Sequence, residues 1–257
     1  MFTFKNVSVE FRTSRGGLCA VDRVNLDIPR RKFVCFVGPS GCGKTTLLNA
    51  AAGLISPSTG TIYYGDAPRG GFSKKIGYVT QNETLFPWRT AAENVRLALE
   101  LEQLPQEEMR SRVTHYMRLV GLDQFHDHYP RQLSGGMRRR AALARTWIYQ
   151  PETVLMDEPF GALDAQLKLV MQRQLLQLWE SSRSTVIFVT HDLAEAVTLA
   201  DQVVVFTARP ARIKAVRNID LPRPRDPYRL HFSPEVQAIC SELWNLLEDE
   251  LTGETLQ

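Results

Sequence analysis

Residues Gly38–Thr46 have the sequence GPSGCGKTT, and this stretch decides the fold. It contains the pattern GxxxxGK[ST], in which glycines allow backbone N–H groups to close around phosphate groups. An apolar run, Lys32–Val37, predicts a buried strand before it, and Thr46–Leu54 predicts the helix that follows. A strand, a glycine-rich turn and a helix in this order indicate a nucleoside triphosphate site. We expect Lys44 to reach the β and γ phosphates and the Thr45 hydroxyl to bind Mg²⁺.

The residues around this loop predict an α/β fold. Strand-like and helical patterns alternate along the chain, which is typical of a mainly parallel sheet. The predicted elements are buried strands at Thr153–Met156, Thr185–Thr190 and Gln202–Phe206, an antiparallel side sheet between Gly60 and Val79, and helices from Ala91 to Arg145. We therefore expect one nucleotide-binding core that is interrupted by a helical insert.

The composition fits one substantial soluble core. The chain has 257 residues, of which 44% are hydrophobic and 23% are charged, and its net charge of +3 gives no argument for nucleic acid as a partner. No apolar stretch approaches the roughly 20 residues needed to cross a bilayer. The first residues lack the basic segment followed by an apolar segment that is typical of a secretory signal. The four cysteines form no paired CxxC spacing, so neither a disulfide framework nor a zinc site is expected.

A second phosphate-binding pattern is LSGGM at Leu133–Met137. A Ser-Gly-Gly turn that opens a helix presents backbone N–H groups and a hydroxyl outward, which suits a polyphosphate. We expect Ser134, Gly135 and Gly136 to form this cradle. Because the chain already has one phosphate loop, a second is explained if it serves the nucleotide of a partner. The short basic run Arg138–Arg140 is expected to be a solvated or salt-bridged face.

Charged side chains at strand ends are the candidates for chemistry on the nucleotide. Asp157 and Glu158 follow the predicted strand Thr153–Met156. A buried strand cannot hold unpaired charge, so both acids belong at its exposed carboxyl end. His191 follows the predicted strand TVIFVT. Taken alone, the acids are explained as an acidic turn and the histidine as a surface residue or helix cap.

The order of these motifs resembles the ATP-binding subunit of an ABC transporter, over roughly Phe2–Arg217. The resemblance implies an α/β P-loop NTPase (RecA-like) core with a small antiparallel β subdomain and an inserted α-helical subdomain. It also implies an ATPase coupled to transmembrane transport, with ATP and Mg²⁺ as ligands. Asp157 would hold Mg²⁺, Glu158 would be the general base for the attacking water, and His191 would be the switch histidine at the γ phosphate. The nucleotide-binding residues would be Gly38, Pro39, Ser40, Gly41, Cys42, Gly43, Lys44, Thr45 and Thr46 of one chain, and Ser134, Gly135 and Gly136 of a second.

Three further positions take a role from the resemblance. Gln81, in VTQNETLFPWR, matches the glutamine that reaches Mg²⁺ and senses the transport subunit. Ala162–Asp164 matches the loop that crosses the dimer interface. Phe11 stands where the family places an aromatic ring on adenine, although a hydrophobic residue at a strand end explains it equally well. The sequence departs from the family at Met137, where the commonest signature has Gln.

The resemblance implies that each ATP site is shared between two copies of the chain, and that hydrolysis drives their closing and opening. A chain without a membrane span needs permease subunits, and we expect a periplasmic or extracellular substrate-binding protein as well. The chain would be a peripheral protein at the cytoplasmic face of the cell (inner) membrane. Leu85–Arg89 is a candidate docking surface, because exposed Phe and Trp are useful at an interface. Packing of Trp88 between the core and the helical insert is the other explanation.

The runs LFPWRTAAENV, DEPFGALDAQ and FTARPARI resemble those of bacterial importers of nitrate, sulfonates, taurine and related small organic molecules. The predicted organisation is an ATP-binding domain at 1–220, with a helical subdomain at about 88–146, and a linker and short helix at 221–257. The proline-rich segment Leu221–Pro227 indicates the linker, and Ser233–Glu235 indicates the helix start. The alternative function is a non-transport ABC ATPase acting in translation or DNA repair. Translation-type members usually carry two cassettes in one chain and DNA-repair members insert a long coiled coil, and this sequence shows neither feature.

Overall fold

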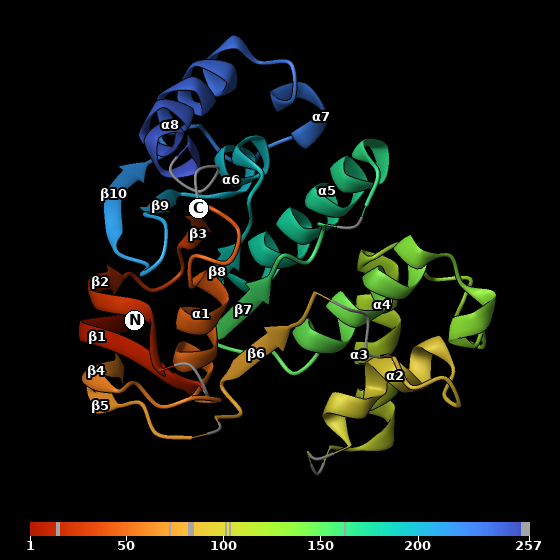
Figure 1. Cartoon of the computed structure of the whole chain (residues 1–257). Coiled ribbons are helices and arrows are strands. Elements are labelled where there is room, and N and C mark those ends of the chain that lie inside the picture. The colour runs from red at the N-terminus through yellow and green to blue at the C-terminus, as the bar shows by residue number, and fades with distance from the viewer. Residues whose placement is uncertain are drawn as a thin grey trace. The chain divides into compact units, whose positions relative to one another are not determined.

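The computed structural model describes residues 1–13, 16–71, 73–81, 85–100, 102, 104–161 and 163–252. Contacts within the chain divide it into two compact units. Unit 1 comprises Met1–Lys74 and Thr185–Gln257, and unit 2 comprises Lys75–Ser184. Figure 1 shows the elements of both, coloured along the chain. Within the described residues, no helix combines the length and the apolar character needed to cross a membrane.

Unit 1 contains an antiparallel sheet in the order β2-β1-β4-β5. Figure 1 shows its strands side by side: β1 (Phe2–Thr13), β2 (Gly16–Ile28), β4 (Thr59–Tyr64) and β5 (Ala67–Pro68). The alternation of the first residues accounts for β1, because Phe2 and Phe4 point to the same, buried face and stack with ring centroids 6.1 Å apart. This sheet is the small antiparallel subdomain that the family resemblance implies.

The core of unit 1 is a mainly parallel sheet in the order β10-β9-β3-β8. Its strands are β3 (Phe33–Val37), β8 (Thr185–Val189), β9 (Gln202–Phe206) and β10 (Ile213–Asn218). β3 pairs in parallel with both β8 and β9, and β10 pairs with β9 in antiparallel orientation. Every residue of β3 and β8 is buried, as expected for continuous apolar runs in a parallel sheet.

The helices of unit 1 are α1 (Lys44–Ala52), α6 (Leu193–Leu199), α7 (Pro227–Leu230) and α8 (Pro234–Thr252). α1 begins at Lys44 rather than at the predicted Thr46, because the glycine turn leads directly into the first helical turn. α8 begins at the predicted Pro234 and packs against α6. Its residues Leu243 and Leu247 are buried, as their helical spacing predicts.

The proline-rich segment Leu221–Pro227 is packed, in contrast to the predicted linker. Leu221 and Arg225 are buried, and the Arg223 guanidinium forms an ion pair with Asp201 at 2.8 Å. Prolines interrupt regular structure, which the sequence shows, but the arginines between them tie the segment to the body. A pattern of prolines does not reveal those ties.

Unit 2 combines a parallel strand pair, β6 (Ile76–Val79) and β7 (Thr153–Asp157), with helices. The helices are α2 (Ala91–Arg96), α3 (Gln106–Leu119), α4 (Gly135–Trp147) and α5 (Ala165–Ser182), with 3₁₀ turns at Leu97–Leu99 and Pro130–Gln132. α2, α3 and α4 pack on one another, as can be followed in Figure 1. They form the helical part that the sequence predicts after Ala91.

β6 corrects the prediction for Gly60–Val79. The sequence predicts that Ile76–Val79 joins the antiparallel side sheet, whereas the structure pairs it in parallel with β7. Gly77 gives the physical reason, because a Cβ there would lie 2.7 Å from the Thr146 side chain of α4. The glycine therefore allows α4 to pack directly on the strand. Flanking glycines and prolines resemble those of a side sheet, so the sequence does not distinguish the two placements.

Candidate functional site

The phosphate loop lies between β3 and α1 of unit 1. Gly43, the N-cap of α1, has φ 129, and a Cβ there would lie 2.3 Å from the Ala20 carbonyl oxygen, so only glycine fits. Lys44 follows with 4% of its surface exposed. Its Nζ donates to the carbonyl oxygens of Gly38 at 2.8 Å and Pro39 at 2.6 Å. The ammonium group is therefore held inside its own loop.

The loop fits a polyphosphate ligand. α1 has neither a side-chain cap nor an acidic residue in its first turn, whereas Ser134 caps α4 and Asp164 caps α5. The positive end of the α1 dipole and the buried Lys44 ammonium together favour an anion at this point. Of the remaining loop residues, Ser40, Gly41 and Thr45 are exposed, Thr46 is half-buried, and Cys42 is buried.

His191 leaves the sheet of unit 1 at the same edge as the phosphate loop, because β3 and β8 are neighbouring parallel strands. Its side chain is exposed. The residues around it are fixed by hydrogen bonds: the Thr190 hydroxyl donates to the buried Glu195 carboxylate at 2.5 Å and accepts from the Asp192 N–H at 3.0 Å. The predicted switch histidine therefore stands on a well-held turn next to the phosphate loop.

In unit 2 the predicted acids and glutamine also follow the carboxyl ends of neighbouring parallel strands. β6 and β7 are parallel neighbours, so Gln81, just after β6, and Asp157, at the end of β7, lie at the same edge. Asp157 and Glu158 are half-buried, and Gln81 is exposed. Glu158 has φ 42, a left-handed backbone conformation that only a small share of non-glycine residues adopt. Burial, with the Asp157 charge added, raises the pKa of Tyr78, so this neighbour stays a neutral hydroxyl.

Arg139 of α4 ties these two strand ends together. It is 6% exposed, and its guanidinium donates to the carbonyl oxygen of Gln81 at 2.6 Å and to that of Pro159. The sequence predicts a solvated or salt-bridged face at Arg138–Arg140, and the burial of Arg139 contradicts a solvated position for this residue. The usable signal was its helical spacing, because Arg139 lies three residues after Gly136 on the buried face of α4.

The Ser-Gly-Gly turn opens α4, as predicted. The Ser134 hydroxyl accepts from the Met137 N–H at 3.2 Å, so the residue that departs from the family signature still completes the cap through its backbone. Ser134 is exposed and Gly135 is half-buried. Gly136 is buried, and a Cβ there would lie 2.8 Å from the Leu167 side chain of α5. This glycine therefore allows α4 to pack closely on α5.

α5 starts at the other predicted interface loop. The Asp164 carboxylate caps it by accepting from the Leu167 N–H at 2.9 Å. Because Leu167 also contacts the Gly136 position, the signature turn and the start of α5 are fixed to each other. Ala162, the first residue of the predicted Ala-Leu-Asp loop, lies outside the described residues.

Phe11 lies in β1 opposite Leu18 of β2 and is 39% exposed, so its ring is accessible to a ligand.

The predicted site residues fall into two groups, one in each unit. Unit 1 holds Phe11, the phosphate loop and His191, and unit 2 holds Gln81, the two acids and the Ser-Gly-Gly turn.

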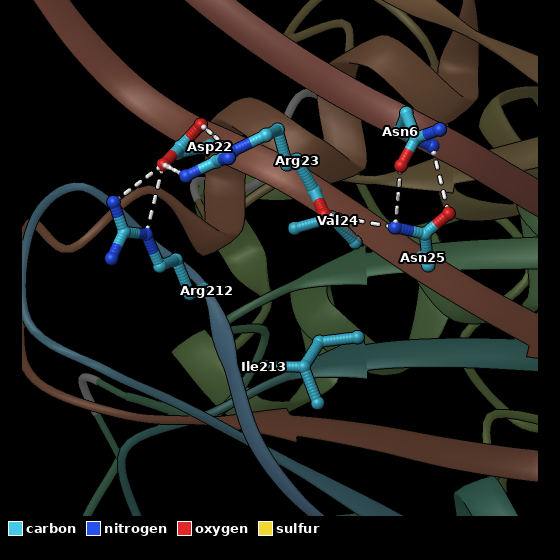
Figure 2. A pocket seen from close by; sticks show the side chains of 7 residues that line it. All are labelled: Asn6, Asp22, Arg23, Val24, Asn25, Arg212 and Ile213. Carbon is cyan, nitrogen blue, oxygen red and sulfur yellow. Dashed lines mark hydrogen bonds and ion pairs between the residues drawn. The ribbon is translucent and has the colours of Figure 1, made fainter.

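A pocket of about 500 Å³ in unit 1 contains none of the predicted site residues (Figure 2). The Asp22 carboxylate forms ion pairs with Arg212 at 2.6 Å and Arg23 at 3.2 Å, and hydrogen bonds from these two arginines lower the pKa of Asp22. The Asn25 amide donates to the Asn6 side chain at 2.9 Å. The lining residues are Asn6, Asp22, Arg23, Val24, Asn25, Arg212 and Ile213. The polar groups of this pocket are engaged with one another, and its lining residues are not among those predicted for the nucleotide site.

This chain is similar to known proteins. The sequence model of the ABC transporter family matches residues 21–161. An ATP-binding protein of Brucella abortus (strain 2308) is 46% identical over 243 residues, which cover 95% of this chain and 92% of the relative. The nitrate import ATP-binding protein NrtD of Synechococcus elongatus is 40% identical over 247 residues, which cover 95% of this chain and 90% of that protein.

A solved structure is also similar. It shows the ATP-binding cassette MJ0796 as a dimer in a post-hydrolysis state, bound to ADP and Pi. The TM-score is 0.75 at 31% identity, and the likeness covers 86% of this chain and 100% of that one. The predicted α/β P-loop NTPase fold, the predicted family and the predicted enzyme class are confirmed by these similarities. This chain belongs to the ABC transporter family and is one of its ATPases.

Proposed function

We propose that the chain is the ATP-binding and ATP-hydrolysing subunit of an importer, and that it energises uptake of a small solute through a separate membrane permease. The buried Lys44 ammonium at the start of α1 carries the ATP-binding part of this proposal. A buried cation is costly unless an anion completes its surroundings, and the phosphates of ATP supply that anion.

The proposed ligands of Mg²⁺ are the Thr45 hydroxyl, the Asp157 carboxylate and the Gln81 side chain. Oxygen ligands from one carboxylate, neutral side chains and substrate phosphates are the donor set that Mg²⁺ accepts. Bound there, the ion would neutralise part of the charge on the phosphates. Within the described residues, no group of three or more His, Cys, Asp and Glu side chains could hold a metal ion by itself.

Hydrolysis requires a proton acceptor and a well-placed water. In our proposal the oxygen of the water attacks the γ phosphorus while Glu158 accepts a proton from that water. The bond between the γ phosphorus and the bridging oxygen breaks, and ADP leaves. The place of Glu158 directly after the carboxyl end of β7, where it is half-buried beside Asp157, supports this role. His191 would hydrogen-bond the γ phosphate and the water, and Phe11 would stack on the adenine.

A second copy of the chain would complete each ATP site with its Ser134, Gly135 and Gly136. Two observations support this shared site. Ser134 is exposed at the start of α4, and Gly136 fixes α4 to the start of α5, where Asp164 lies. Two of the elements that would face a partner chain are therefore held as one rigid surface. The dimeric state of the MJ0796 cassette agrees with this arrangement.

The permease would dock on the segment Leu85–Arg89. The Phe86 and Trp88 rings stack with centroids 5.1 Å apart, and Trp88 is 70% exposed. Asn94 of α2 is fully buried and fixes this segment: its side-chain oxygen accepts from the Phe86 N–H at 2.7 Å, and its amide donates to the Arg89 carbonyl oxygen at 3.0 Å. An exposed tryptophan that stacks on the half-buried Phe86 and is held by a buried amide favours contact with a partner over packing in the core.

The proposed cargo is a small solute of the nitrate, sulfonate or taurine type. NrtD of Synechococcus elongatus is named for nitrate import, and its similarity supports this branch. A substrate-binding protein would deliver the solute, and the chain would work at the cytoplasmic face of the cell membrane.

The proposed domain organisation is an ATP-binding domain at 1–220 with a helical subdomain at about 88–146, followed by the C-terminal segment 221–257. The alternative, an ABC ATPase of translation or DNA repair, has no support from the relatives compared.

Glu158→Gln tests the catalytic proposal. The amide cannot accept the proton, so hydrolysis should stop while ATP stays bound, and the variant should accumulate as a dimer with ATP and Mg²⁺. Size-exclusion chromatography with light scattering measures this. Glu152→Gln is the matched control, because Glu152 lies in the same unit and is exposed, pairing with Lys75 at 2.7 Å. A Glu158→Gln chain that stays monomeric at saturating ATP would contradict the proposal.

Trp88→Ala tests the permease contact. It should abolish co-purification with the membrane permease and leave ATP binding unchanged, because Trp88 lies outside both phosphate-binding motifs. Trp244→Ala is the control, since Trp244 of α8 is another exposed tryptophan, at 52%. Equal permease recovery from the Trp88→Ala and Trp244→Ala variants would contradict the proposed docking surface.

A further inference from the structure

The segment after β10 is bound tightly to the end of α6. Arg225 is 7% exposed and carries the strongest of these contacts. One terminal nitrogen of its guanidinium donates to the carbonyl oxygens of Val197 at 3.3 Å, Thr198 at 3.2 Å and Ala200 at 2.7 Å, and the other donates to those of Ile219 at 3.3 Å and Leu221 at 3.0 Å. One buried side chain therefore joins the C-terminal end of α6 to the chain that follows β10.

The charge of Arg225 suits this position. Burial, and then the neighbouring charge of Arg223, lower the pKa of Arg225 to about 10, so it remains a cation at neutral pH. A cation at a helix C-terminus interacts favourably with the helix dipole. Arg223 donates to the Leu199 carbonyl oxygen at 2.7 Å and to the Asp201 carboxylate at 2.9 Å, and Asp201 also accepts from the Phe33 N–H at 2.9 Å. The end of α6 is thus tied to the first residue of β3, the strand that leads into the phosphate loop.

The other end of α6 is the His191 turn. α6 has seven residues, and a helix of that length spans about 10 Å. The Asp192 carboxylate caps it by accepting from the Glu195 N–H at 3.1 Å, and Thr190 bonds to both of these residues. α8 packs against α6 as well. A short helix held at both ends moves as one piece, so a displacement at its C-terminal end also displaces His191.

We propose that Arg225 is a positioning residue for ATP hydrolysis: it fixes α6 from its C-terminal end and thereby holds His191 in place for the γ phosphate. The inference rests on the proposed role of His191. Within the described part of the chain, Arg225 hydrogen-bonds to carbonyl oxygens of α6, of Ala200 and of the segment after β10, and it acts through these contacts rather than on the nucleotide. The segment predicted as a linker is, in this view, part of the catalytic unit.

Two substitutions test the proposal. Arg225→Met keeps the aliphatic stem and removes all donors, and Arg225→Lys keeps the charge with fewer donors. We expect Arg225→Met to lower kcat for ATP by roughly 10- to 100-fold, the effect of displacing a catalytic group by about 1 Å, while the Kd for ATP changes less than about twofold. The kcat of Arg225→Lys should lie between that of Arg225→Met and that of the unchanged chain. Arg217→Met is the control, since the Arg217 guanidinium donates to Glu242 of α8 and to the Asn218 carbonyl oxygen, both at 2.9 Å.

Hydrogen exchange provides a readout that does not need ATP turnover. In Arg225→Met the amides of residues 190–200 should exchange faster, while those of α1 stay as they are. If Arg225→Met folds but keeps kcat, or loses ATP affinity and kcat together, the positioning role is refuted. If it does not fold, an Arg225→Lys chain with unchanged kcat refutes it. If the unchanged chain shows no ATP hydrolysis at all, the proposed function fails, and faster or unaltered exchange at residues 190–200 still decides whether Arg225 holds α6.

Discussion

Arg139 is a buried charge of unit 2, and Arg139→Met is the sharpest test of its structural role. The substitution keeps a side chain of similar length that can still fill its place in α4. It removes the guanidinium, and with it the hydrogen bonds to the carbonyl oxygens of Gln81 and Pro159. Gln81 is itself a proposed metal ligand, and Pro159 follows the proposed general base, Glu158.

The expected loss of stability follows from these contacts. A hydrogen bond from a charged donor contributes about 1.5 to 3 kcal/mol, so losing two should lower the free energy of unfolding by roughly 3 to 6 kcal/mol. We take the lower end, about 3 kcal/mol, because the freed carbonyl groups can relax toward water. For a chain of this length, that loss corresponds to a fall in Tm of roughly 6 to 12 °C.

Thermal unfolding followed by circular dichroism measures this difference. Arg131→Met is the control, because Arg131 is exposed in the neighbouring 3₁₀ turn, and substitutions at such positions change stability by less than about 0.5 kcal/mol. The kcat for ATP should fall in Arg139→Met, because the backbone next to Gln81 and Glu158 loses its support. The same Tm for both variants would refute the reasoning.

Three further outcomes are expected. Gly43→Ala should lower ATP affinity at least about tenfold in calorimetric titration, because the added Cβ meets the Ala20 carbonyl oxygen and the residue needs a positive φ, whereas Gly70→Ala meets no atom within 4 Å and should bind ATP normally. Asn94→Ala should reduce permease co-purification as Trp88→Ala does, and should lower the free energy of unfolding by roughly 2 kcal/mol, because it leaves the backbone groups of the docking segment without their partner. Burial raises the pKa of Cys35 well above its ordinary value, so at pH 8 its thiol stays protonated, and mass spectrometry should find it unmodified by iodoacetamide in the native chain and modified after unfolding.

The sequence predicts correctly that residues 38–43 form a turn between a buried strand and a helix, because the glycines and the apolar run before them act locally. The Lys44 ammonium bonds to the carbonyl oxygens of Gly38 and Pro39, six and five residues before it, so these contacts are local in the sequence. The buried strands β3 and β8 are equally clear, since continuous apolar runs have few alternative placements.

What the sequence does not predict depends on contacts between distant residues. Arg139 meets carbonyl groups 58 and 20 residues away, and Arg225 meets some that are 25 to 28 residues away. In the sequence, both look like ordinary surface arginines. The sequence predicts the wrong sheet for β6 for the same reason. The close packing of Gly77 against Thr146 depends on the position of α4, which the sequence of β6 does not contain.

The shared ATP site is the central claim, and mixing two defective chains tests it most directly. Lys44→Ala should disable a chain's own phosphate loop, and Ser134→Glu should disable the turn it offers to its partner, because a carboxylate there repels phosphate. Each variant alone should hydrolyse no ATP. In an equal mixture, half of the dimers should be mixed and contain one intact site, so about a quarter of the activity of the unchanged chain should return if partners exchange freely. A mixture as inactive as its components, despite mixed dimers detected by native mass spectrometry, would contradict a site built from two chains.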